Sequence, residues 1–476
     1  MQLNKIKLHS CTTFASAQSQ ITLDDDYNVP DYRPDIVKVL KEKGELQFDE
    51  VKAAAGAAWL KGRLVFKVLY RSDQDNAKIS CLKGEIPFQE KLNMDGVQEY
   101  DVIQASGEIE DLTIGVIHSR KISVRAVILL KTEEPREKED ELCVGIEADD
   151  GCEKRYRNTN ILQLLCMKRD QCRQKSEITL PSSKPNVQEI LWKSLEIRNL
   201  DTKMGQDGVK LSGEVLISVL YQEEEETDRV QWYETVIPLD CGVECDAGTE
   251  ADIIYKVKAR PASMELEVKP DYDGEERVLV LELVMNLDIR VWKEQEISML
   301  EDVYSLKQEI IPVCTGVTLQ HISVKNDSQC RLTEQMELAE SQEKILQICS
   351  CEGTVHLEST ELTGQGVRAE GILVTELLYI TTDDQMPIGS AREIYPFEQL
   401  IEIPQQTART ERNKPEELEA LERKNKLQTE LDCRISQLSA VMLDQDHVEI
   451  KAVIGLDLLA FEQEQIDNIT DMREEP

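Results

Sequence analysis

The sequence predicts a mainly β protein made of three tandem repeats, each folded as a β-sandwich or an open barrel. One strand-like stretch occurs three times, as GRLVFKVLY from Gly62, GEVLISVLY from Gly213 and GILVTELLY from Gly371. Around each stretch lie several short apolar runs separated by turn residues, which is the pattern of an all-β domain. A chain of 476 residues is long enough to bury several separate cores.

Further landmarks keep a constant distance from each repeated glycine. An aliphatic residue stands 26 positions before it, at Ile36, Val187 and Ile345. A proline with an apolar neighbour stands 25 positions after it, in Ile86-Pro87-Phe88, Ile237-Pro238-Leu239 and Tyr395-Pro396-Phe397. Pro34 and Pro185 precede the aliphatic residue by two positions in the first two repeats, whereas the third has Glu343 there. Several equal offsets in three copies indicate duplication followed by divergence.

The first two repeats open on a short apolar stretch, DIVKVL in the first and NVQEILW in the second. The pattern is helix-like, and these stretches are expected to cap or link the sheets. The repeated strand follows. Its residues two, four, six and eight after the glycine share one face by the period of a β-strand, and we expect them to form the core. They are Leu64, Phe66, Val68 and Tyr70; Val215, Ile217, Val219 and Tyr221; and Leu373, Thr375, Leu377 and Tyr379.

The opposite face of the repeated strand mixes charged and apolar residues, which predicts a sheet covered on one side and wetted on the other. The tyrosine is expected to close the edge of the core with its hydroxyl at the rim. Strand-like runs at 122–130, 277–292 and 448–461 close the three repeats. The predicted domains are residues 1–135, 156–295 and 300–476. The acidic segment Thr132–Arg155 is expected to be a flexible connector.

The third repeat departs from the others after its proline, and a helical insertion is predicted at residues 405–440. Asn413 can cap a helix, Pro415 suits its first turn, and Glu416 favours the positive end of the helix dipole. Leu418, Leu421 and Leu427 form a thin apolar stripe. A solvated helix is preferred over one that binds a partner.

Charge and composition limit the class of partner. The chain has 55 lysine and arginine residues against 92 aspartate and glutamate, a net charge of −37. This argues against direct binding to nucleic acid or anionic lipid and favours neutral, basic or cation-bearing partners. The N-terminal stretch lacks the apolar run of a secretory signal, and no window has the ~18 uncharged apolar residues of a membrane helix. A cytoplasmic protein is expected.

The thirteen cysteines include no CxxC pair. Reduced thiols are predicted rather than a disulfide framework, with late oxidative cross-linking as the alternative. Cys172 and Cys330 stand at the same distance, 41 residues, before the glycine of the second and third repeats, where the first repeat has Ile21.

No nucleotide-binding, hydrolase, kinase or zinc-protease motif is present. The histidines His9, His118, His321, His356 and His447 are isolated, and a base–nucleophile pairing of His356 with Cys351 is disfavoured. The acidic clusters at 24–26, 223–226 and 271–276 are interpreted as solvated turns. The last begins like a calcium loop, but a hairpin turn at Asp273-Gly274 explains it better. We therefore predict no catalytic residue, no cofactor and no metal site.

The combination of KPxVxxIL, GxLxxxVLY and the proline motif, repeated in one chain, resembles the SPOCS domain of spore coat and exosporium morphogenetic proteins of the SipL and CsxC type. The resemblance implies a non-enzymatic scaffold in the mother-cell cytoplasm, at the forespore surface or in the spore coat, that binds other envelope proteins and possesses several similar surfaces. Self-association is a further possibility. Some relatives carry a LysM module, which the C-terminal DNITDMREEP does not resemble.

The alternative is a carbohydrate- or peptide-binding β module of the cell or spore envelope. Such a module needs exposed aromatic side chains, but aromatic residues make up 5% of the chain. The four tryptophans are expected to be mostly buried; they are Trp59, Trp192, Trp232 and Trp292.

Overall fold

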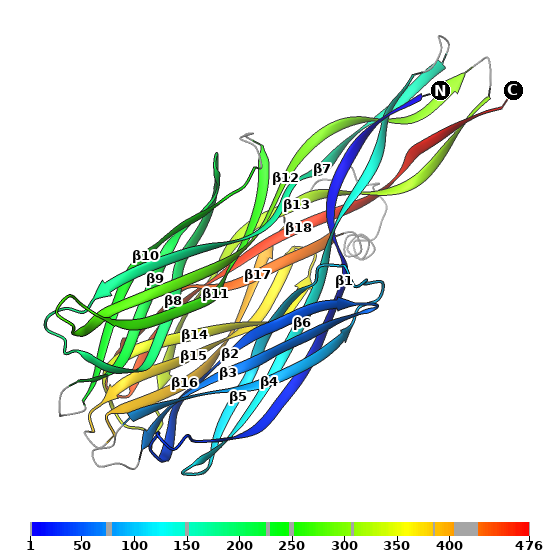
Figure 1. Ribbon diagram of the computed structural model, residues 1–476. Coiled ribbons are helices and arrows are strands. Elements are labelled where there is room, and N and C mark those ends of the chain that lie inside the picture. The colour runs from blue at the N-terminus through cyan, green and yellow to red at the C-terminus, as the bar shows by residue number, and fades with distance from the viewer. Residues whose placement is uncertain are drawn as a thin grey trace.

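The structure is a computed structural model that describes residues 2–72, 79–147, 152–224, 229–246, 252–305, 309–383, 386–403 and 427–475. The described residues form eighteen β-strands in six antiparallel three-stranded sheets. The predicted mainly β class is therefore confirmed. Figure 1 shows three groups of strands packed side by side, with paired ribbons projecting from one end.

The strands occur in the same order in all three repeats. The first repeat has β1 (Gln2–Asn28), β2 (Ile36–Ala54), β3 (Ala57–Ser72), β4 (Ile79–Asn93), β5 (Gln104–His118) and β6 (Lys121–Glu147). The second has β7 (Cys152–Thr179), β8 (Val187–Gly205), β9 (Gly208–Glu223), β10 (Val230–Glu244), β11 (Ile253–Pro270) and β12 (Glu276–Ser305). The third has β13 (Glu309–Glu337), β14 (Ile345–Leu362), β15 (Gly366–Thr381), β16 (Ile388–Glu402), β17 (Leu427–Met442) and β18 (His447–Glu475).

Each repeat is a sandwich of two sheets. In the first repeat, one sheet has the order β2-β3-β4 and the other β1-β6-β5, and the same orders recur in the second and third. We call the sheets centred on β3, β9 and β15 the inner sheets. One hydrophobic core lies between the two sheets of each repeat. The twelve side chains predicted to face these cores are all at most 1% exposed, which confirms the predicted core.

The repeated glycine keeps its offset because two neighbours crowd it. Gly62, Gly213 and Gly371 each lie opposite an irregularity in the preceding strand, where that strand bulges. On the other side each pairs directly with the apolar residue after the motif proline, Phe88, Leu239 or Phe397. A Cβ on Gly62 would lie 2.5 Å from the carbonyl oxygen of Gln47 and 2.7 Å from the ring of Phe88. The landmark offsets are thus contacts between neighbouring strands.

The stretches at the head of the repeats are strands, so their interpretation as helix-like segments was wrong. Ile36, Val187 and Ile345 begin β2, β8 and β14, and each pairs with the last residues of the repeated strand. The stretch alternates buried and exposed side chains only loosely because β-bulges interrupt it twice near its start. A short apolar run without strict alternation does not distinguish a strand from a helix.

Two other sequence-based expectations need correction. In the segment expected to be a flexible connector, Thr132–Glu147 belongs to β6 and Cys152–Arg155 to β7. In the predicted helical insertion, residues 427–440 belong to strand β17, and residues 405–426 lie outside the described residues. The helix with Asn413 and Pro415 therefore stays a prediction, and β17 replaces its C-terminal part.

Three long strand pairs extend beyond the sandwiches and form a stalk. The outer halves of β1 and β6, β7 and β12, and β13 and β18 pair only with each other. Figure 1 shows these ribbons projecting together, with both chain ends at the tip. A cluster of apolar side chains from all three ribbons holds the stalk together; it includes Leu8, Leu142, Ile161, Met299, Leu319 and Ile466. Each ribbon leaves its sandwich at a bulge in the same place, 48 residues before the glycine, at residues 14, 165 and 323.

The three repeats share a further apolar cluster, which we call the junction. It receives residues from the same three positions of every repeat, namely 22 before the glycine and 7 and 17 after it. These are Leu40, Leu191 and Cys349; Leu69, Leu220 and Leu378; and Ile79, Val230 and Ile388. Equal positions from three repeats meeting at one place describe an approximate threefold arrangement within a single chain. The outer face of the repeated strand is therefore covered here, which corrects the prediction that it is wetted.

Candidate functional site at the seams between repeats

One carboxylate beside the junction contacts both other repeats. Glu352 on β14 accepts hydrogen bonds from Lys43 Nζ at 2.5 Å and from Trp192 Nε1 at 3.1 Å, and it pairs with Lys41 Nζ at 2.8 Å. The two lysines come from β2 of the first repeat and the tryptophan from β8 of the second. The Lys41 ammonium also lies 5.7 Å from the centre of the Trp192 ring. Glu352 is thus the point where all three repeats are joined by polar contacts.

Burial and charge oppose each other in this cluster. Burial disfavours the ionised Glu352, but Lys41 and Lys43 outweigh it and hold the pKa of the carboxyl well below its ordinary value. Burial also disfavours the charged Lys43, and Glu352 nevertheless raises the pKa of that ammonium. The side chain of Lys41 is only 3% exposed. The ionised states of Glu352 and Lys43 therefore depend on their partners remaining in place.

The charges around the cluster differ among the repeats in an ordered way. Three side chains stand side by side across each inner sheet at equivalent positions: Lys43, Lys67 and Lys83; Ser194, Ser218 and Glu234; and Glu352, Glu376 and Arg392. The row of the first repeat is basic, and two members of the row in the third are acidic. The basic and acidic rows touch through Lys43 and Glu352. This opposite-charge contact favours the observed arrangement of the first and third repeats, because like charges at these positions would be destabilising.

The other seams carry ion pairs as well. Arg290 on β12 makes two hydrogen bonds with Glu430 on β17, at 2.9 and 2.6 Å, between the second and third repeats. Arg33 makes two with Glu189, at 3.1 and 2.7 Å, between the first and second. Paired guanidinium–carboxylate contacts fix orientation as well as attraction. Each pair of repeats is therefore connected by oriented charge pairs as well as by the apolar junction.

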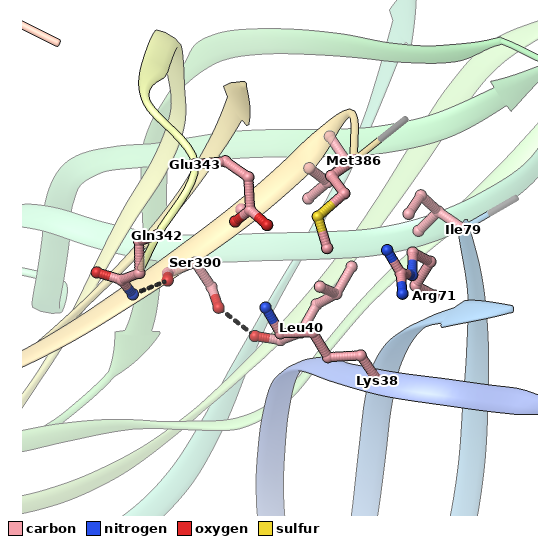
Figure 2. Close-up of a pocket in the computed structure, with 10 residues that line it drawn as sticks. Lys38, Leu40, Arg71, Ile79, Gln342, Glu343, Met386 and Ser390 are labelled. Atoms are coloured by element: carbon pink, nitrogen blue, oxygen red, sulfur yellow. Dashed lines mark hydrogen bonds between the residues drawn. The ribbon is translucent and has the colours of Figure 1, made fainter. Parts of the chain in front are cut away.

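A small cavity lies where the first and third repeats meet beyond the junction. It has a volume of about 140 Å³ and is lined by Lys38, Leu40 and Arg71 on one side and by Gln342, Glu343 and Ser390 on the other. Figure 2 shows Ser390 donating to the carbonyl oxygen of Leu40, while Gln342 Nε2 donates to the carbonyl oxygen of Ser390 at 3.1 Å. The bond from Ser390 to Leu40 joins the two repeats across the seam, and the bond from Gln342 holds the Ser390 backbone within the third repeat.

A larger cavity of about 710 Å³ opens between strands β2 and β5 of the first repeat and strands β14 to β16 of the third. Its lining mixes apolar residues with charged ones. Burial, together with Glu376, raises the pKa of Glu42 to about 7. His356 Nδ1 contacts Glu108 across the same cavity and, more than any other group, holds the pKa of Glu108 below its ordinary value. The charged groups that line this cavity can form ion pairs, as His356 and Glu108 do, and Glu42 can take up a proton near neutral pH.

The structure keeps Cys351 and His356 apart, although a nucleophile and its base would have to be in contact. Cys351 and His356 are an odd number of positions apart in a regular part of β14. Cys351 packs against the core of the third repeat, whereas His356 faces the first repeat. Burial raises the pKa of Cys351 to about 12, so its thiol stays protonated at neutral pH. The disfavoured base–nucleophile pairing is not formed.

The acidic clusters differ in environment. Asp24, Asp25 and Asp26 lie within strand β1 rather than in a turn, so the interpretation as a turn was wrong there. Asp271 closes the predicted hairpin turn by accepting backbone hydrogen bonds from Asp273 at 2.9 Å and from Glu275 at 3.0 Å. Gly274 has φ of 85° in this turn. Glu223 ends strand β9, and residues 225–228 lie outside the described residues.

Across the described ranges, no group of three or more histidine, cysteine, aspartate or glutamate side chains is placed to hold a metal ion. The same ranges contain no helix with the length and hydropathy to cross a membrane. Trp192 and Trp292 are buried as expected, with 4% and 3% exposure. Trp59, in contrast, is 39% exposed.

One cysteine expectation needs correction. Cys172 on β7 and Cys241 on β10 form a disulfide with their Cα atoms 6.1 Å apart, joining the two sheets of the second repeat. The remaining eleven cysteines are free. Cysteine spacing in the sequence does not predict this bond, because the two residues are 69 positions apart and become neighbours only when the two sheets pack together.

The model of the SPOCS domain of SipL matches residues 35–117, 186–269 and 344–422, which together make up more than half of the chain. The chain belongs to the SPOCS domain family. Each matched segment starts at the first strand of an inner sheet, and the first two extend to β5 and β11. The long strands of the stalk lie outside the first two matched segments. Membership in this family indicates a role related to sporulation. No curated protein and no solved structure matched the chain.

The residues of the junction and seams were not identified from the sequence. The signal was present, because leucine stands seven residues after the glycine in all three repeats, on the face expected to be wetted. An apolar residue at the same outward position of every copy indicates a shared contact. Lys41 and Glu352 carry no such signal, since they differ among the repeats.

Proposed function

We propose that this SPOCS protein is a non-enzymatic scaffold of the spore coat or exosporium that binds other envelope proteins. It would act in the mother-cell cytoplasm, at the forespore surface or within the coat. The proposal rests on the family and on the way the repeats are used. Apolar residues on the outer faces of the inner sheets pack together at the junction, so the three repeats are held together and their other faces are left for partners.

The observation that carries the proposal is the difference between the outward faces of three otherwise equivalent repeats. Residues 2–147 contain 20 basic and 26 acidic residues, residues 152–305 contain 20 and 31, and residues 309–475 contain 14 and 33. If the repeats served stability alone, they would not need such unequal charges. Unequal charges suit a scaffold that binds a different partner at each repeat, because charge complementarity selects partners and speeds their encounter.

The third repeat is the expected contact for a basic partner. Its acidic excess attracts such a partner at low ionic strength, and the attraction is expected to weaken as salt is added. Contacts to more than one repeat would then add through effective concentration, without any single contact being strong.

Localisation tests the proposal most cheaply. A fluorescent fusion is expected to form a ring or cap around the forespore during sporulation. A diffuse signal throughout the mother cell, or expression confined to growing cells, would argue against an envelope scaffold. A pull-down from sporulating cells is expected to recover coat or exosporium proteins, and less of them as salt increases.

A second candidate function, recognition of a sugar polymer or peptide, is supported by Trp59. Its half-exposed ring lines a hollow of about 370 Å³ together with Glu50, Lys61, Gln89 and Glu99. Aromatic rings beside polar groups suit stacking on a sugar. Co-sedimentation with spore polysaccharide that is lost in Trp59→Ala, without any protein recovered in the pull-down, would favour this function over the scaffold.

A further inference from the structure

The second repeat contains a second pair of cysteines next to its disulfide. Cys166 lies on β7 and Cys245 directly follows β10, and their Sγ atoms are 3.5 Å apart. The same two segments are already joined by Cys172 and Cys241. The repeats without this pair have Ala15 and Met94, or Val324 and Ile403, at the same distances from the glycine.

The position of Cys166 relates this cysteine pair to the base of the stalk. It comes immediately after the bulge at residue 165, where the ribbon of β7 and β12 leaves the sandwich and enters the stalk. Cys245 belongs to the other sheet of the same sandwich, at the end of β10, and is buried. A bond between them would fasten the base of a stalk ribbon to the opposite sheet.

We propose that Cys166 and Cys245 form a second disulfide that braces the base of the stalk in the second repeat. The sulfur atoms need to approach by about 1.5 Å to reach the length of an S–S bond, ~2.05 Å. The two sulfur atoms already lie within hydrogen-bonding distance of each other across the sandwich. The inference is independent of the proposed scaffold function.

The surroundings assign different roles to the two thiols. Lys168 Nζ donates a hydrogen bond at 2.7 Å to the carbonyl oxygen of Glu244, next to Cys245, and lies beside both cysteines. Burial raises the pKa of Cys245 to about 11, so its thiol is a poor first nucleophile. Cys166, which is partly exposed, is therefore the thiol that reacts first with an oxidant from solution.

The reaction requires an external oxidant, and a small-molecule disulfide of the glutathione class supplies it. The Cys166 thiolate attacks one sulfur of the oxidant, whose S–S bond breaks and releases one thiolate. Cys245 then loses its proton to solvent and attacks Cys166 Sγ, forming the protein disulfide and expelling the second thiolate. The two protein thiols lose two electrons and two protons in total, and the oxidant is reduced to two thiols.

Peptide mapping tests the proposal on the full-length chain. The folded protein is treated with oxidised glutathione at pH 8, alkylated in denaturant and digested without reductant. We expect a peptide that joins Cys166 to Cys245, with neither of these two cysteines alkylated. Both cysteines alkylated after treatment, or each linked to a different partner, would overturn the proposal.

Single substitutions separate the two roles. Cys245→Ser is expected to trap glutathione on Cys166, whereas Cys166→Ser is expected to leave Cys245 unmodified. Cys314→Ser, which removes an exposed thiol, serves as the matched control and is expected to leave the Cys166–Cys245 peptide unchanged. Equal trapping on either remaining cysteine would contradict the assigned order. Circular dichroism of each variant checks that the fold is retained.

Discussion

At the scale of single residues, the repeated tyrosine shows how an equivalent position can differ among the repeats. Tyr70 donates to the carbonyl oxygen of Pro34 at 3.1 Å, and Tyr221 donates to that of Pro185 at 3.3 Å. Tyr379 has no hydrogen-bond partner among the described residues. The third repeat has Glu343 where the others have this proline, so the lost landmark and the lost hydrogen bond coincide.

Tyrosine-to-phenylalanine substitutions are expected to have unequal effects for this reason. Tyr70→Phe and Tyr221→Phe should each lower the free energy of unfolding by about 1 kcal/mol, because each removes a hydrogen bond and leaves a carbonyl unpaired. Tyr379→Phe should be neutral or slightly stabilising, since it removes a buried hydroxyl without a partner. Urea unfolding of the three variants measures the difference, and a loss for Tyr379→Phe equal to the other two would refute this explanation.

Glu42 predicts how stability depends on pH. Its pKa is raised from 4.5 to about 7 in the folded chain, first by burial and then by Glu376. The folded chain therefore holds a proton that the unfolded chain releases near pH 4.5, so this contribution is complete below that pH and is lost as the pH rises to about 7. Asp111 and Arg392 also face the carboxyl, with opposing effects on its charge.

Glu42→Gln tests this dependence because glutamine stays neutral. The variant is expected to melt at a higher temperature than the natural chain at pH 8, and the two melting temperatures should converge near pH 5. Glu50→Gln, an exposed carboxylate on the same strand, is the control and should not change the slope. Parallel curves for Glu42→Gln and the natural chain between pH 5 and 8 would contradict the raised pKa.

At the scale of elements, the bulge opposite each glycine fixes the inner sheet. A Cβ would lie 2.5 Å from the Gln47 carbonyl oxygen at Gly62 but 3.0 Å from the Arg198 carbonyl oxygen at Gly213. The second repeat leaves more space at its glycine for two reasons. Asn199 adopts a positive φ of 51° in a wider bulge, and Leu239 stands where the other repeats have a phenylalanine.

The loss of stability on replacing each glycine with alanine is therefore expected to be larger where less space is available. Gly62→Ala should destabilise the chain by about 2 kcal/mol, as overpacking between two strands does. Gly213→Ala should cost less. Thermal unfolding of the full chain gives the order, and an equal or larger loss for Gly213→Ala would show that the bulge does not explain the repeated glycine.

The repeated strands and their core-facing residues were predictable from the sequence because both depend on short-range alternation. Leu64, Phe66 and Val68 show this directly, since their spacing alone places them inside. The first strand of each inner sheet was not, because bulges interrupt its alternation. The stalk was not predictable, because its ribbons carry charged side chains such as Lys7 and Glu139, which pair at 2.7 Å. Such ribbons have the composition of a linker, and their apolar residues form a cluster when the ribbons of all three repeats pack together.

At the scale of the whole molecule, the junction and its charges could not be derived from one repeat. Leu69 and Glu352 become neighbours of other repeats only when all three are present, so the information is distributed over the chain. The contact of Lys43 with Glu352, two residues at equivalent positions of different repeats, favours the observed placement of the first repeat beside the third. The three repeats of the chain therefore pack around the junction as the subunits of a trimer would.

Glu352→Gln is expected to lower the free energy of unfolding by about 3–5 kcal/mol, because the buried ammonium of Lys41 would lose its main partner. Exposed Glu358→Gln on the same strand is the matched control and should change little. A combined Lys41→Met and Glu352→Gln variant should recover part of the loss, as removing both charges spares the cost of an unpaired one. Chemical denaturation measures all three, and an unchanged midpoint for Glu352→Gln alone would contradict the role of the cluster.

Small-angle X-ray scattering of the purified monomer tests the central claim most directly, namely that three repeats pack around one junction and share one stalk. A compact chain of this length has a radius of gyration of about 23 Å, and the stalk, whose strands extend roughly 12 residues or ~40 Å beyond the sandwiches, should raise it. We predict a pair-distance distribution with one main maximum and a tail from the stalk. Separate maxima from three independently moving sandwiches would contradict the account.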